Sequence, residues 1–119
     1  MTQMNGVSMM GKFEHGEIWL VRYKFEESNE YKARPVVILG DKAYEFRAYK
    51  MTSQKPRDKY DYKIRDYYKS GLSKPTTIRI SKYIKITEGI LIKKLGRLND
   101  IEIRKVIILI NEYYNEKRR

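Results

Sequence analysis

At 119 residues with 41% hydrophobic content, the chain has the size of one folded domain and is too short for two separate cores. It contains no cysteine and a single histidine, His15, which excludes disulfides, thiolate metal sites and any site that needs two histidines from one subunit. Its 26 Lys and Arg against 15 Asp and Glu leave a net charge of +11, so we expect a polyanionic partner, with nucleic acid as the first candidate.

No apolar stretch approaches the roughly 20 residues that a membrane-spanning helix requires, so we expect no membrane segment. Together with the absence of cysteine, this favours a cytoplasmic protein. Residues 1–15 show no periodicity and are predicted to be a flexible leader. A single domain is then expected over residues 16–119.

Three strands are predicted in the first half of this domain. Glu17–Phe25 alternates apolar and polar side chains, as a half-buried strand does. Val36–Leu39 is uniformly apolar, which indicates a central strand covered on both faces. A tight turn at 40–42 then leads into a third alternating strand, Tyr44–Thr52, and the two strands form a hairpin.

Arg34 stands at the entrance to the central strand. Pro35 fixes its own φ and keeps the preceding residue extended, so the guanidinium of Arg34 is presented rigidly at the strand start. In an antiparallel hairpin, Arg34 entering and Thr52 leaving would lie side by side. From this stretch alone, a solvated surface arginine is the alternative interpretation.

The segment Lys55–Lys69 interleaves basic residues with tyrosines, a pattern typical of surfaces that bind unpaired RNA bases. A surface loop with one short strand around Tyr60–Ile64 explains the same pattern equally well. Three more short strands follow, at Thr76–Ser81, Tyr83–Ile86 and Ile90–Leu95. About six closely spaced strands predict a small barrel.

The period changes after Asn99, where one terminal helix is expected. Asn99 and Glu102 have the spacing of a capping box. Ile108 and Leu109 lie off the main apolar stripe and indicate a second covered surface, as in a subunit contact. The stripe itself consists of Ile103, Val106, Ile107, Ile110 and Tyr114.

Four motifs in order and spacing resemble the PemK/MazF family of toxins from type II toxin-antitoxin systems: Gly16–Val21, Ala33–Leu39, Thr52–Gln54 and Gly71–Thr76. The resemblance implies a mainly β (α+β) fold, an SH3-like small β-barrel of about six strands with a C-terminal helix, in a homodimer. It further implies a metal-independent endoribonuclease that cleaves single-stranded RNA through a 2′,3′-cyclic phosphate, needs no cofactor and is neutralised by an antitoxin. The positive charge favours a small acidic protein for that antitoxin.

The resemblance also assigns the site. The family's arginine before proline falls on Arg34 and its strand-end threonine on Thr52, both expected to be catalytic. The expected RNA-binding residues are Lys32, Ser53, Gln54, Lys55, Arg57, Thr76, Arg79 and Ser81.

Two departures from the family stand beside these assignments. Some members carry an acidic residue where this chain has Ser81, and a loop histidine before the Arg-Pro motif that this chain lacks. The same barrel also serves other roles. A catalytically silent module that binds nucleic acid or protein, and a gyrase-inhibiting toxin, are therefore the alternative functions.

Overall fold

The computed structural model describes residues 13–24, 29–42 and 45–117. One α-helix and six strands make up this part of the chain, with a short 3₁₀ turn, η1, before the last strand. Their bounds are β1 (Glu17–Tyr23), β2 (Lys32–Lys42), β3 (Glu45–Thr52), β4 (Asp61–Lys63), β5 (Thr77–Lys85), η1 (Glu88–Ile90), β6 (Leu91–Arg97) and α2 (Asp100–Lys117).

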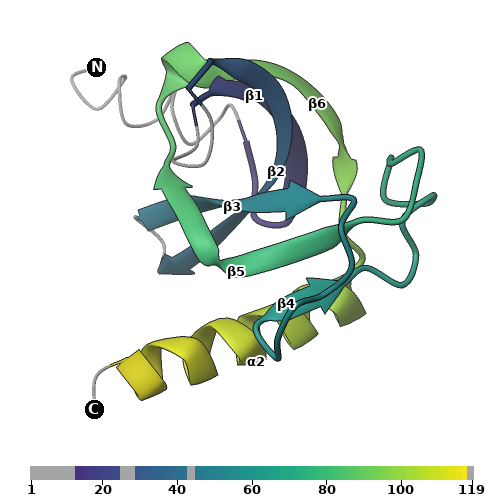
Figure 1. Cartoon of the computed structure of the whole chain (residues 1–119), viewed down its shortest axis with the longest axis vertical. Coiled ribbons are helices and arrows are strands. Elements are labelled where there is room, and N and C mark those ends of the chain that lie inside the picture. Colours follow the sequence, from purple (N-terminus) through teal and green to yellow (C-terminus); the bar gives the residue numbers. More distant parts are fainter. Residues whose placement is uncertain (1–12, 25–28, 43–44, 118–119) are drawn as a thin grey trace.

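All six strands belong to one antiparallel sheet with the order β4-β5-β3-β2-β1-β6. The sheet curls strongly, and α2 lies across one side of it along β4 and β5 (Figure 1). The predicted fold class, mainly β with about six strands and one C-terminal helix, is confirmed. Among the described residues the two edge strands, β4 and β6, do not pair, so the sheet is barrel-like without being closed by hydrogen bonds.

Strand β2 is the centre of the core, as its apolar run predicts. Val36 and Ile38 point into a cluster on one face of the sheet, and Val37 and Leu39 into a cluster on the other. Each of the four has 2% or less of its surface exposed. Because side chains alternate along a strand, only an uninterrupted apolar run can supply both clusters at once.

Helix α2 covers one face through the predicted stripe. Ile103, Val106 and Ile110 are buried against the sheet, and Ile107 packs at the margin, whereas Ile108 is exposed. The helix starts as expected, because Asn99 Oδ1 accepts a hydrogen bond from the Glu102 amide (2.8 Å).

The second half of the predicted capping box is wrong. The Glu102 carboxylate does not turn back to the helix start but accepts hydrogen bonds from the Tyr62 hydroxyl (2.6 Å) and from the amides of Arg65 (2.8 Å) and Asp66 (3.1 Å). Burial, followed by this bond to Glu102, raises the pKa of Tyr62. Glu102 therefore ties α2 to the segment after β4, which a local sequence pattern does not reveal.

Two glycines let that segment cross β6. A Cβ on Gly96 would lie 1.9 Å from the Ser70 carbonyl oxygen, and a Cβ on Gly71 would lie 2.2 Å from the Leu95 carbonyl oxygen. Gly71 also has a φ of 96°, which favours glycine. The turn after β4 is thus pressed directly onto the opposite edge of the sheet.

Several predicted boundaries differ from the structure: β2 already starts at Lys32 rather than at Val36, and β6 runs to Arg97 rather than to Leu95. The turn expected at 40–42 is wrong, since β2 continues to Lys42 through an irregularity in its pairing with β3. The separate strand at Tyr83–Ile86 is wrong as well, because β5 runs unbroken to Lys85. Phe13, within the expected leader, is buried against Phe46. Residues 1–12 of that leader, together with Phe25 and Tyr44, lie outside the described residues.

Within the described parts of the chain, no helix has both the length and the apolar character needed to cross a membrane.

Candidate active site

Pro35 marks the point where β2 and β3 separate. The ladder between them ends at Val36 opposite Lys50, and proline has no amide hydrogen to extend it. Both strands nevertheless continue, β2 along β1 to Lys32 and β3 along β5 to Thr52. Continuing the register by two residues sets Arg34 opposite Thr52 across the resulting opening.

A pocket of about 480 Å³ occupies this opening. Seven of the ten residues assigned from the sequence line it: Arg34, Thr52, Ser53, Gln54, Arg57, Thr76 and Arg79. The other lining residues are Ala33, Pro35, Lys50, Met51, Lys74 and Lys82. The predicted proximity of Arg34 and Thr52 is thus found in the fold.

Lys32, Lys55 and Ser81 do not line the pocket. The family resemblance assigns Ser81 to the same face as Arg79, but the register between β3 and β5 shifts after Lys50 opposite Arg79. The extra residues in β5 reverse which side chains face the pocket, so Lys82 takes the place expected for Ser81. A single sequence gives no sign of such a bulge.

Lys50 is the lining residue that sequence reasoning could have found. It lies two residues before Thr52 on the same strand and therefore on the same face. Its side chain is buried between β2 and β5, since Lys50 is paired with Val36 on one side and Arg79 on the other. A lysine that follows Phe46 and Ala48 on the apolar face of an alternating strand was an available indication of function.

The pocket is strongly cationic. Its described lining contains six basic side chains and no carboxylate: Arg34, Lys50, Arg57, Lys74, Arg79 and Lys82. Over residues 13–24, 29–42 and 45–117 there is no cluster of three or more His, Cys, Asp or Glu side chains that could hold a metal ion. A group of cations around hydroxyl groups is suited to binding phosphate oxygens.

One of these cations is held by a buried carboxylate from a neighbouring strand. Arg79 Nη1 donates to Asp61 Oδ2 (2.5 Å), and only 3% of the Arg79 side chain and 1% of the Asp61 side chain are exposed. The two residues stand opposite each other in the β4–β5 ladder. Arg79 is therefore fixed at the base of the pocket rather than extended into solvent.

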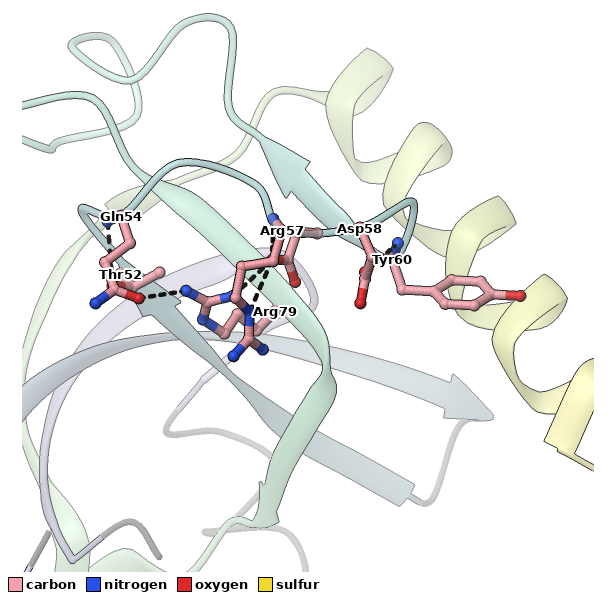
Figure 2. Close-up of polar contacts among 7 residues, drawn as sticks. Thr52, Gln54, Arg57, Asp58, Tyr60 and Arg79 are labelled. Carbon is pink, nitrogen blue, oxygen red and sulfur yellow. Dashed lines mark hydrogen bonds and ion pairs between the residues drawn. The ribbon is translucent and has the colours of Figure 1, made fainter. Parts of the chain in front are cut away.

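The Arg79 guanidinium also reaches the loop after Thr52. Its Nη2 donates to Gln54 Oε1 (2.6 Å), and the Gln54 amide donates to Thr52 Oγ1 (3.2 Å). Figure 2 shows Arg79 pointing toward Gln54 and Thr52, with Arg57 beside it and Asp58 and Tyr60 further along the same turn. The Thr52 hydroxyl thus has a defined acceptor role toward the backbone.

A barrel-like sheet whose separated strands enclose a cationic, hydroxyl-lined pocket defines a small β protein built to bind anionic groups. Comparison with known families gives a match to the PemK-like, MazF-like toxins of type II toxin-antitoxin systems over residues 14–114. The chain belongs to this family, as its four motifs indicate. No curated protein matches it significantly.

Proposed function

We propose that this chain is the endoribonuclease toxin of its toxin-antitoxin pair and cleaves single-stranded RNA without a metal ion. The observation that carries the proposal is that Arg34 and Thr52, from two strands that separate at Pro35, line one pocket together with five further cations. Six positive charges repel a divalent cation and supply the electrostatic stabilisation themselves.

The proposed reaction uses the RNA's own 2′-hydroxyl. Its oxygen forms a bond to phosphorus and loses its proton, the bond from phosphorus to the 5′-oxygen breaks, and that oxygen gains a proton. The products are a 2′,3′-cyclic phosphate and a 5′-hydroxyl. Negative charge builds up on the non-bridging oxygens in the transition state, so preorganised donors aimed at these oxygens accelerate the reaction.

Arg34 and Thr52 have different roles in this proposal. The planar guanidinium of Arg34 offers paired donors that match two phosphate oxygens. The Thr52 hydroxyl is too weak an acid and base to move the proton, so it orients the phosphate by donating a hydrogen bond. The remaining cations hold the neighbouring phosphates of the strand.

The partners follow from the same surface and from the family. We propose a homodimer in the cytoplasm, neutralised by a small acidic antitoxin whose carboxylates occupy the cationic pocket in place of RNA phosphates. Lys32 and Lys55, which lie outside the pocket, are assigned to contacts with flanking nucleotides, and Ser81 keeps only its sequence-based assignment.

The test is to incubate the purified protein with mixed-sequence RNA in EDTA and to map the new ends. Cleavage that leaves cyclic phosphates, and that stops when a 2′-deoxynucleotide replaces the nucleotide before the cut, is the expected result. Binding without cleavage would instead support the silent binding module. Gyrase-dependent DNA breaks with intact RNA would support the gyrase inhibitor.

A further inference from the structure

Asp61 is a carboxylate that contacts two residues of the proposed site without itself lining the pocket. It is buried in β4, and its Oδ2 atom accepts hydrogen bonds from Arg79 Nη1 (2.5 Å) and from the Arg57 amide (2.8 Å). The Arg57 side chain lies nearby as well, with Nε 3.5 Å from the same oxygen. One carboxylate oxygen therefore holds two residues that line the pocket from different segments.

A continuous chain of hydrogen bonds leads from this carboxylate to Thr52. Arg79 donates one hydrogen bond to Asp61 and a second to the side-chain oxygen of Gln54 (2.6 Å). The backbone amide of Gln54 then donates to the hydroxyl oxygen of Thr52 (3.2 Å). A hydroxyl that accepts a bond from the backbone keeps its own hydrogen for a different partner. The chain thus leaves the Thr52 hydrogen available to a ligand in the pocket.

We propose that Asp61 is a positioning residue for the cleavage reaction, acting on Thr52 through Arg79 and Gln54. The inference rests on the proposed function. Asp61 touches neither RNA nor the reacting atoms. Its carboxylate fixes the guanidinium that fixes Gln54, and by also holding the Arg57 amide it closes the loop that runs from the end of β3 to the start of β4.

The negative charge of Asp61 allows its effect on RNA binding to be distinguished from its effect on cleavage. Its negative charge lies beside a cationic pocket, so removing it increases the attraction for RNA phosphates. Removing it also weakens the hold on Arg79 and hence on Gln54, because an asparagine oxygen in place of the carboxylate accepts a weaker hydrogen bond from the guanidinium. Displacing catalytic groups by about 1 Å can slow a reaction by about a hundredfold. Removing the charge of Asp61 should therefore slow the cleavage step and leave RNA binding equally tight or tighter.

The first variant is Asp61→Asn. We expect kcat to fall at least about tenfold, while the Kd for RNA measured with a 2′-deoxy substrate analogue stays the same or decreases. The matched control is Asp58→Asn, which removes one negative charge from the same turn. Asp58 contacts the Tyr60 amide (2.8 Å), not the arginines, and asparagine keeps this acceptor, so kcat should stay at the wild-type value.

The second variant is Gln54→Ala, which breaks the same chain at an exposed residue without leaving a buried charge unpaired. It keeps the proposal testable even if Asp61→Asn fails to fold. We expect a lower kcat at unchanged melting temperature. Because Gln54 Oε1 is held by Arg79, we also expect little change in Kd, in place of the RNA-binding role assigned to Gln54 from the sequence. Because Asp61 and Gln54 belong to the same chain of hydrogen bonds, their effects should not add. The kcat of the double variant should fall no further than that of the more impaired single variant.

The outcomes distinguish failure of the positioning role of Asp61 from failure of the proposed nuclease function. If the wild-type protein cleaves RNA but Gln54→Ala retains full kcat, the positioning role is overturned while the nuclease function stands. A weaker Kd with unchanged kcat in Gln54→Ala would make Gln54 a direct RNA contact and would also overturn it. If the wild-type protein does not cleave RNA at all, the proposed function and the positioning role fail together.

Discussion

At the scale of single residues, the pocket depends on one proline in an otherwise regular strand. Pro35 keeps Arg34 extended, and it stands just beyond the last pair of the ladder to β3. A residue with an amide hydrogen could extend that ladder and bring the two strands together. Pro35 therefore orients Arg34 and also lies where β2 and β3 separate to form the opening that Arg34 lines.

Substitutions at Arg34 and Thr52 test their proposed roles. Arg34→Ala should lower RNA cleavage by about 10²- to 10³-fold, as loss of a transition-state donor does. Arg34→Lys keeps the charge but not the planar fork, so it should recover only part of this loss. Thr52→Val keeps the shape without the hydroxyl and should reduce kcat with little effect on folding, checked by melting temperature. Full activity in both Arg34→Ala and Thr52→Val would refute the site.

The single histidine predicts a pH dependence of stability. The Gly40 amide donates to His15 Nδ1 (3.1 Å), and burial, followed by the charge of Arg97, lowers the pKa of His15 below its ordinary value of 6.5. The unfolded chain then binds the proton more readily than the folded chain. Neutral His15 therefore contributes to the free energy of unfolding in full above pH 6.5. This contribution is lost as the pH falls from 6.5 through the lower pKa that His15 has in the folded state.

His15→Asn isolates this effect, because asparagine offers an acceptor oxygen but does not titrate. Between about pH 7.5 and 5.5, the unfolding free energy of the wild type should fall relative to that of His15→Asn, as measured by urea denaturation. Parallel curves over this range would show that His15 is not coupled to folding.

At the scale of elements, the contact between the turn at 67–71 and β6 brings the two edges of the sheet together. Leu72 donates its amide back to Tyr67 (3.0 Å) and closes the turn. The approach is so close that both facing residues are glycines, Gly71 and Gly96. Together with the Glu102 carboxylate, which holds the segment before this turn, it anchors β4 and hence Asp61.

Gly96→Ala should therefore destabilise the fold by about 3 kcal/mol or more, because its Cβ would meet backbone that cannot move aside. Gly89→Ala is the matched control, since a Cβ there meets nothing within 4 Å. It should change the unfolding free energy by less than about 0.5 kcal/mol. Denaturant titration of both variants is the measurement, and equal stabilities would contradict the close crossing.

At the scale of the whole molecule, the chain carries a net charge of +11, and six of its basic side chains line one opening. RNA binding that engages all six should weaken with salt, with a slope of log K against log salt of about −4 for a single strand. Lys82→Ala should make this slope shallower by about 0.7 and leave RNA sequence preference unchanged. Salt-independent binding would mean that the pocket is not the RNA site.

Sequence patterns predicted much of the fold, and the resemblance to a known family supplied most of the site assignments. The uniform apolar run of β2, the alternation in β1 and β3 and the helical stripe of α2 are local periodicities, and each is found in the structure. The order of β1 to β3 as a meander is equally local, and it brings Arg34 near Thr52. Seven of the ten residues that the family resemblance assigned to the site line the pocket, and among them the predicted hairpin accounts for the proximity of Arg34 and Thr52.

Tertiary structure alone decided the rest. The bulge that puts Lys82 in the place expected for Ser81, the crossing of Gly71 over Gly96 and the turn of Glu102 toward β4 all depend on backbone that approaches from distant parts of the chain. The pairing of Asp61 with Arg79 is of the same kind, because it arises from strand register between β4 and β5. Periodicity reports which face a side chain takes within one element. Which residue it meets there is set by how the elements pair and pack, and that is where the support for the proposed site lies.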